Sequence, residues 1–143
     1  MQFVEGHSMF TWPVRVYYED TDLGGVVYYA NYLKFMERAR TEWLRSLGVD
    51  QSRLLDKAGL IFVIVSAEAR YIQPARFNDA LVVTARLESS RRTTMTFVQE
   101  IHRDSLEGEL LVRGRVQAAC VEASGFRPRP IPVEILEKLE RPV

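Results

Sequence analysis

The stretch that decides the fold runs from residue 17 to residue 44 and opens with Tyr17-Tyr18-Glu19-Asp20-Thr21-Asp22-Leu23-Gly24-Gly25-Val26-Val27-Tyr28-Tyr29-Ala30-Asn31-Tyr32. An acidic cluster and a Gly24-Gly25 turn stand directly before the longest amphipathic helix that the sequence predicts. The first N–H groups of a helix have no intrahelical partner, so we expect a carboxylate and free backbone donors to lie close together here.

The predicted helix begins at about Ala30. Its apolar residues recur at three- and four-residue spacing, in a set made up of Tyr32, Phe35, Met36, Ala39, Trp43 and Leu47. About 16 residues at 1.5 Å per residue give a length of roughly 24 Å, and Gly48 is a typical C-terminal stop. Leu33 and Leu44 widen the apolar stripe. A stripe this broad favours a sheet as the packing partner over one neighbouring helix.

One strand is predicted before this helix and four strands after it. The first covers residues 11–19, with Pro13 at its start or on an edge because proline cannot donate to a ladder. The later strands are predicted at residues 60–72, 80–88, 93–103 and 109–122. Short turns join them, which favours antiparallel pairing, since a parallel connection needs about a dozen residues. Short helices are predicted at residues 50–58 and 133–140.

Length and composition predict a single domain, residues 1–143, with an ordered core at about residues 10–140. The 19 basic and 19 acidic residues give no net charge, which disfavours a nucleic-acid partner. Cys120 lies in an apolar run and is expected to be a small buried hydrophobe. Residues 1–10 lack the features of a signal peptide, and no apolar stretch approaches about 18 residues. We therefore expect no membrane span and a cytoplasmic location.

Several motifs together resemble one family. They are Trp12 to Asp22, Asp22-x-x-Gly25-Val26-Val27-Tyr28-Tyr29-x-Asn31-Tyr32, Glu37-Arg38-Ala39-Arg40, Tyr71-x-x-Pro74-Ala75-Arg76-x-x-Asp79, and Arg127-Pro128-Arg129. From about Phe10 to Glu140 the chain resembles the hotdog-fold acyl-CoA thioesterases of the 4-hydroxybenzoyl-CoA thioesterase type. It is most similar to the bacterial Tol-Pal-associated acyl-CoA thioesterase branch. That branch commonly has His where this chain has Tyr29, whereas the 4-hydroxybenzoyl-CoA enzyme's pattern has Tyr there.

The resemblance implies an α+β hotdog fold. In this fold an antiparallel sheet of about five strands wraps around one long central helix, with short accessory and C-terminal helices. The implied activity is hydrolysis of an acyl-CoA thioester to a carboxylic acid and free CoA, with no cofactor and no metal, because CoA is part of the substrate. We expect these features from the family rather than from composition or spacing.

Thioester hydrolysis needs an attacking oxygen, or a base that makes one, and a donor for the charge that forms on the carbonyl oxygen. Asp22 stands at the family's catalytic carboxylate position and is expected to act as nucleophile or general base. The expected oxyanion donor is the backbone N–H of Tyr29, aided by the helix dipole. Gly25 is expected to let the thioester approach the main chain.

The predicted substrate-binding residues are Val27, Tyr28, Asn31, Tyr32, Phe62, Arg91, Arg92 and Thr93. Phe62 and Tyr28 are expected to line the acyl cleft together with the ring of Tyr29. Arg91 and Arg92 lie at a predicted strand turn, where guanidinium groups would bind the phosphates of CoA. Alternatively, these two arginines are solvent-exposed turn residues that bind no ligand.

Other charged residues are assigned structural roles. Glu37 lies at the edge of the apolar helix stripe and is expected to pair with Arg38, Arg40 or another cation. Arg76 is expected to pair with an acid such as Asp79.

The resemblance also implies a homodimer with sites between subunits, often doubled to a tetramer, and acyl carrier protein is a further candidate partner. Two other functions stay open. One is a non-catalytic acyl-carrier-protein-binding or envelope-complex accessory module, which would not need Asp22. The other is a hotdog hydratase or dehydratase. It is disfavoured because such enzymes carry a histidine near the helix start, whereas this chain has only His7 and His102.

Overall fold

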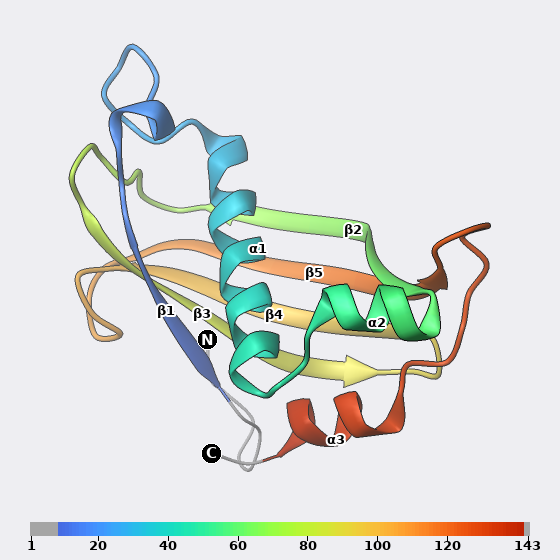
Figure 1. The fold of residues 1–143 in the computed structure, drawn as a ribbon. Helices are drawn as coiled ribbons and strands as arrows, with labels where there is room; N and C mark the ends of the chain where they lie inside the picture. The colour runs from blue at the N-terminus through green and yellow to red at the C-terminus, as the bar shows by residue number, and fades with distance from the viewer. Residues whose placement is uncertain (1–8, 142–143) are drawn as a thin grey trace.

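A computed structural model describes residues 9–141 of the chain. Its elements follow in the order β1 (Phe10–Arg15), the 3-10 turn η1 (Tyr18–Asp20), α1 (Tyr29–Ser46), α2 (Gln51–Ala58), β2 (Leu60–Tyr71), β3 (Ala80–Ser90), β4 (Thr94–Arg103), β5 (Leu110–Glu122) and α3 (Val133–Glu140) (Figure 1). Residues 1–8 and 142–143, part of the predicted single domain, lie outside the described residues. They include His7 and most of the segment considered as a signal peptide.

The five strands form one sheet in the order β1-β3-β4-β5-β2, and each neighbouring pair is antiparallel. The predicted antiparallel pairing is confirmed. Pro13 lies on β1, which is an edge strand, as its missing N–H requires. The sheet curves around α1, which crosses one of its faces (Figure 1). An antiparallel five-stranded sheet around one long helix is the α+β architecture that the resemblance implies.

Helix α1 packs onto the sheet through the predicted apolar stripe. Its buried residues are Tyr32, Phe35, Met36, Ala39, Arg40, Trp43 and Leu44. Leu33 instead remains 36% exposed, so it does not widen the buried stripe. Arg40, a charged residue, takes a buried place that the pattern did not predict. Helix and sheet are tightly packed at Gly114 of β5, where an added Cβ atom would come within 2.7 Å of Met36 Cε.

Gly114→Val is therefore expected to lower the free energy of unfolding by about 1–3 kcal/mol, the usual cost of overpacking a core. Met36 is fully buried and has little room to move away. Urea denaturation would measure the effect. Gln117→Val, at a partly exposed position on the same strand, is the control and should change stability by no more than about 0.5 kcal/mol. Equal stability of both variants would contradict the close helix–sheet contact.

Strand β1 ends at Arg15 and not near Glu19, where the sequence predicted its end. The reason is local. Asp20 Oδ2 accepts a hydrogen bond from the Tyr17 N–H at 2.9 Å, and the chain turns through η1. Such side-chain bonds offer the backbone an alternative to the strand ladder. The aromatic and β-branched residues of this segment favour a strand, so the sequence predicted a longer one. Residue types alone do not reveal the hydrogen bond between Asp20 and Tyr17 that ends the strand.

Helix α2 has the predicted caps. The Asp50 side chain accepts the N–H groups of Ser52 and Arg53, and Gly59 adopts a φ of 67° beyond the last turn. Cys120 is fully buried, as expected, and burial raises the pKa of its thiol. These outcomes follow from short-range sequence patterns.

Both predicted ion pairs are wrong. Glu37 Oε2 accepts a hydrogen bond from Thr41 Oγ1 at 2.6 Å, one helical turn away, and its charge acts on Arg40 only from a longer distance. Asp79 Oδ2 accepts the backbone N–H of Arg76 at 2.8 Å, but its ion pair is with Arg103 of β4. Arg103 is distant from Asp79 in the sequence and comes close to it only in the folded chain. Proximity in the sequence therefore predicted Arg76 as the partner of Asp79 incorrectly.

Candidate active site

The acidic turn folds as a short hairpin that leads directly into α1. The Asp22 N–H donates to the Val26 carbonyl oxygen at 2.9 Å, and the Tyr28 N–H donates to the Asp20 carbonyl oxygen at 2.9 Å. The hairpin also contacts the β2–β3 connection, where the Val27 N–H donates to the Ala75 carbonyl oxygen at 2.8 Å. These bonds fix the position of the turn relative to the start of the helix (Figure 1).

Asp22 presents an exposed carboxylate at this turn. Its Oδ1 atom accepts the Gly24 N–H at 2.9 Å, while Oδ2 has no hydrogen-bond partner among residues 9–141. Gly25 adopts a φ of 77°, and no heavy atom lies within 4 Å of the position its Cβ would take. The glycine is required for the backbone conformation, and the space above it is open. One carboxylate oxygen is thus held by the turn and the other is available to water or a ligand.

The start of α1 supplies backbone donors next to this hairpin. Tyr28 is the N-cap residue, and its side chain makes no capping hydrogen bond. Tyr29 is the first helical residue, so its N–H has no intrahelical acceptor. The helix dipole adds positive potential at this end. Such a helix start can stabilise an oxyanion.

Asp20 and Asn31 hold the hairpin against the helix. Asp20 is only 7% exposed. Its carbonyl oxygen accepts a hydrogen bond from Asn31 Nδ2 at 3.1 Å, in addition to the Tyr28 N–H. Asn31, predicted to bind substrate, therefore ties α1 to the loop that carries Asp22. The sequence did not predict this structural role of Asp20. The feature that could have indicated it is the position of Asp20 three residues after Tyr17, a spacing typical of side-chain capping of a backbone N–H.

Asp20→Ala is expected to lower the free energy of unfolding by about 1–3 kcal/mol, because the Tyr17 N–H loses its charged acceptor. Amide hydrogen exchange should also become faster at Tyr17. Asp20→Asn keeps an acceptor oxygen, so its loss in free energy of unfolding should be less than half of that in Asp20→Ala. Glu19→Ala, at an exposed position beside it, is the control. Protection at Tyr17 that is unchanged in Asp20→Ala would contradict this role.

Aromatic side chains form the wall beside the helix start. The ring centroids of Tyr28 and Tyr29 lie 4.7 Å apart, and those of Tyr29 and Tyr71 lie 5.9 Å apart. Tyr28 and Tyr29 are about half exposed, whereas Tyr32 is buried and its hydroxyl accepts the Ala75 N–H at 3.0 Å. The Tyr29 side chain raises the pKa of Tyr28, and burial raises that of Tyr71, so both phenols stay neutral at neutral pH.

Two predicted contact residues, Val27 and Tyr32, lie in the hydrophobic core and support this wall from inside. Tyr71, at the end of β2, was absent from the predicted site although it belongs to one of the motifs. The sequence feature that could have identified Tyr71 as a site residue is its position in that motif, directly before the β2–β3 connection that contacts the hairpin.

The remaining predicted residues are at the opposite end of the sheet. Phe62 lies near the start of β2, and Arg91, Arg92 and Thr93 form the β3–β4 turn (Figure 1). The Arg92 carbonyl oxygen accepts the Ile131 N–H at 2.9 Å, so this turn packs beside the segment before α3. Both arginine side chains are exposed. Within one chain these residues do not meet Asp22.

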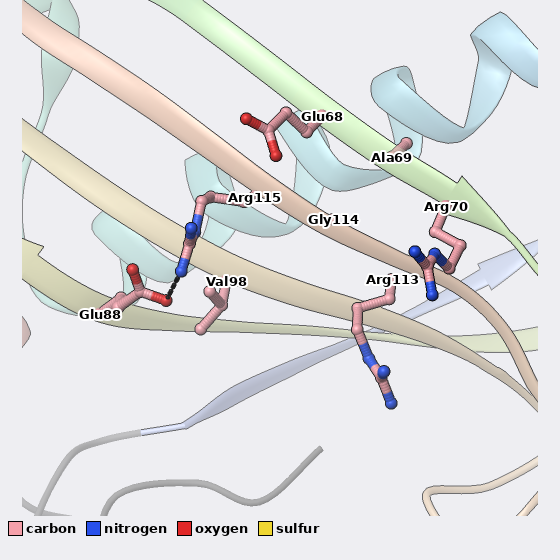
Figure 2. A pocket seen from close by; sticks show the side chains of 8 residues that line it. All are labelled: Glu68, Ala69, Arg70, Glu88, Val98, Arg113, Gly114 and Arg115. Carbon is pink, nitrogen blue, oxygen red and sulfur yellow. Dashed lines mark hydrogen bonds and ion pairs between the residues drawn. The ribbon is translucent and has the colours of Figure 1, made fainter.

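A separate hollow of about 390 Å³ lies on the sheet face away from α1 (Figure 2). Arg113 and Arg115 flank Gly114, whose missing side chain would point to α1, so these arginines point to the other face. Arg115 Nη2 lies 2.7 Å from Glu88 Oε2, and Arg113 Nε lies 3.3 Å from Glu100 Oε2. Acids therefore compensate both charges, and the hollow contains none of the predicted site residues.

The part of the chain that the structure describes contains no helix long and apolar enough to cross a membrane. Within residues 9–141 there is also no cluster of three or more His, Cys, Asp or Glu side chains arranged as a metal site. The expectation that the protein needs no metal and no cofactor stays a prediction.

Comparison with known proteins identifies relatives of this chain. The chain is 42% identical over 126 residues to the acyl-CoA thioesterase YbgC of Haemophilus influenzae, an alignment that covers 88% of this chain and 90% of that protein. It is 40% identical over 134 residues to the acyl-CoA thioester hydrolase YbgC of Escherichia coli O6:H1, covering 94% of this chain and 98% of the relative.

Among solved structures, a 4-hydroxybenzoyl-CoA thioesterase variant in complex with 4-hydroxybenzoyl-CoA superimposes with a TM-score of 0.83. The match covers 92% of this chain and 98% of that chain at 22% identity, which establishes the shared fold. The model of the thioesterase-like superfamily matches residues 16–139. The predicted resemblance is thereby confirmed, and this chain belongs to the thioesterase-like superfamily of hotdog-fold proteins.

Proposed function

We propose that this protein hydrolyses acyl-CoA thioesters to a carboxylic acid and free CoA. The observation that carries the proposal is the Asp22 carboxylate, held by the Gly24 N–H through one oxygen and open through the other, at the uncapped start of α1. The names of the YbgC relatives support the same reaction. An accessory module would not require such a carboxylate.

In this reaction the Asp22 carboxylate either attacks the thioester carbonyl carbon or removes a proton from the water that does so. The carbonyl oxygen becomes negatively charged and accepts a hydrogen bond from the Tyr29 N–H. The carbon–sulfur bond then breaks, and the CoA thiolate leaves and takes up a proton. On the nucleophilic route water afterwards cleaves the mixed anhydride. Gly25 keeps the main chain accessible to the substrate, and Tyr28 and Tyr29 flank the acyl group.

A second subunit completes the site in this proposal. Strand β2 is a 12-residue edge strand, and its Ile64 and Val65 side chains are 50% and 53% exposed. Long apolar edges of this kind favour pairing with another strand. When two copies of β2 pair antiparallel about a two-fold axis, the start of one lies beside the end of the other. Phe62 of one subunit would then approach Tyr71 of the other.

The same pairing explains the division of the predicted residues between the two ends of the sheet. Arg91, Arg92 and Thr93 of one subunit would be carried to the hairpin side of the other, where the arginines would bind CoA phosphates. The resulting assembly is a homodimer, or a dimer of such dimers. We further propose that the protein is located in the cytoplasm and that acyl carrier protein is a further partner.

The histidine of the described residues does not favour a hydratase or dehydratase. His102 lies at the end of β4, where Nε2 is 3.0 Å from Glu100 Oε1 and Nδ1 is 3.1 Å from the Gly108 carbonyl oxygen. These contacts occupy both ring nitrogens. His7 lies outside the described residues.

The test is release of free thiol from a panel of acyl-CoA esters with aliphatic and aromatic acyl groups, incubated with the purified full chain. We expect turnover of at least one class, with one thiol released for each carboxylic acid formed. Formation of an unsaturated or hydrated acyl-CoA without thiol release would favour the hydratase. Tight acyl-CoA binding without any turnover would favour the accessory module.

A further inference from the structure

A cavity of about 350 Å³ lies between α1 and the sheet, near the start of β2. The sheet lines it with apolar side chains that include Phe62 and Phe97, whereas α1 contributes the polar residues Glu37, Arg40 and Thr41 together with Leu44, and α2 contributes Gln51. This volume falls within the range of about 300–1,000 Å³ found for small-molecule sites. The cavity therefore joins an apolar wall on the sheet to a mostly polar wall on the helices.

Arg40 is the buried polar group of this cavity. Its side chain is only 9% exposed, and Nη1 donates to Gln99 Oε1 at 2.8 Å. Among residues 9–141, Arg40 has no ion-pair partner and no second hydrogen bond. Burial lowers the pKa of Arg40 to about 10, with Glu37 acting in the opposite direction, so the group stays charged at neutral pH.

Gln99 fixes the guanidinium without neutralising it. Gln99 Nε2 donates to the Met36 carbonyl oxygen at 3.0 Å and to the Thr84 carbonyl oxygen at 3.2 Å, which leaves Oε1 for Arg40. A guanidinium has five N–H donors. Buried charges are costly unless an opposite charge pairs with them. The donors that Gln99 does not use therefore suit an anion inside the cavity.

Glu37 lines the same cavity and its charge acts on Arg40, but the two side chains do not form an ion pair. Glu37 is exposed, and its Oε2 atom accepts a hydrogen bond from Thr41 Oγ1 on the same helix at 2.6 Å, so it leaves the unused Arg40 donors without a close acceptor. A carboxylate matches the planar fork of a guanidinium and can accept two parallel hydrogen bonds. The apolar wall formed by Phe62 and Phe97 suits a hydrocarbon chain attached to that carboxylate.

We propose that this cavity binds a short apolar chain that ends in a carboxylate, which Arg40 anchors. On the proposed hydrolase function, on which this inference rests, the substrates are acyl-CoA esters whose acyl chains carry a terminal carboxylate. Phe62 lies near the start of β2, which the antiparallel dimer brings beside the end of β2 in the second subunit. The chain bound in one subunit then extends to the Asp22 hairpin of the other.

The first experiment compares kcat/KM for glutaryl-CoA and pentanoyl-CoA, which have the same chain length and differ in the terminal group. The wild-type protein is expected to prefer glutaryl-CoA. Arg40→Met should lower the glutaryl/pentanoyl ratio by about tenfold to a hundredfold, the effect of losing a hydrogen-bonded charge. Because both substrates are assayed on one sample, the ratio is independent of any loss of folded protein. Arg40→Lys should restore part of the preference.

A preference for pentanoyl-CoA in the wild-type protein would overturn the inference, as would an unchanged ratio in Arg40→Met. Ala118→Leu provides a second variant. It retains Arg40 but adds volume at a buried position that lines the cavity. We expect it to lower kcat/KM for both substrates, and unchanged rates for both would contradict binding in this cavity.

Binding of free hexanoate, with hexan-1-ol as the neutral control, separates this inference from the hydrolase function. Calorimetry should detect hexanoate binding that is at least tenfold weaker in Arg40→Met. If no acyl-CoA is hydrolysed but hexanoate binds through Arg40, the hydrolase fails and the cavity site stands. If acyl-CoA esters are hydrolysed but hexanoate binding does not depend on Arg40, the cavity inference fails and the hydrolase stands.

Discussion

Asp22→Asn is expected to lower kcat for acyl-CoA hydrolysis by about 100- to 10,000-fold. An amide is neither a base nor a competent nucleophile toward the thioester carbonyl. The fold should persist, because the Asn side-chain oxygen can still accept the Gly24 N–H that now binds Asp22 Oδ1 at 2.9 Å. Thiol release under saturating acyl-CoA measures kcat, and the circular dichroism spectrum and melting temperature report the fold.

Asp50→Asn is the matched control for this variant. Asp50 is also exposed, and its Oδ1 atom accepts the Ser52 N–H at 2.9 Å, in the same local geometry as Asp22 with Gly24. Wild-type kcat is expected for Asp50→Asn. A kcat within about tenfold of wild type in a correctly folded Asp22→Asn protein would remove Asp22 from the mechanism.

The second large effect is expected at the free edge of β2. Val65→Asp places a charge at a position that is 53% exposed in the single chain. Two such charges near a two-fold axis should prevent strand pairing. We expect a monomer by light scattering and a loss of kcat/KM of at least about thirtyfold, since the loss of a buried interface contact can cost about 2 kcal/mol or more. Leu106→Asp, an exposed apolar position in the β4–β5 turn, is the control.

Subunit complementation tests directly whether one site draws on two chains. Asp22→Asn and the double variant Arg91→Ala/Arg92→Ala are each expected to be nearly inactive at low substrate concentration. Mixed dimers contain one site with both an intact Asp22 and intact arginines. Random exchange should therefore restore about a quarter of wild-type activity, as expected for a two-fold dimer. No recovery in demonstrably mixed dimers would contradict a shared site.

The local features of the fold could be predicted because they depend on neighbours in the sequence. The three- and four-residue apolar spacing defines α1, and the caps Asp50 and Gly59 define α2. The short turns after β2 made antiparallel pairing the natural expectation. The strand order β1-β3-β4-β5-β2 depends on long-range pairing, and it was not predicted from these patterns.

The candidate site was predictable in part for the same reason. Asp22, Gly25 and Tyr29 lie within one continuous segment, so their grouping at the start of α1 follows from a turn and a helix cap. Asp79 was assigned to the wrong arginine because Arg103 comes close to it only when β3 and β4 pair. Phe62, Arg91 and Arg92 were grouped with Asp22, yet the fold places them at the other end of the sheet.

The sequence by itself determined the turn with its exposed carboxylate, the helix start behind it and the strands that form the sheet. Each of these rests on hydrogen bonds and periodic patterns that span only a few residues. Only the tertiary structure decided that β2 is a free edge, that Asp20 is buried beneath the hairpin and that Arg40 points into a cavity. Burial and edge position depend on which distant segments pack together, and residue types near in sequence carry little information about that packing.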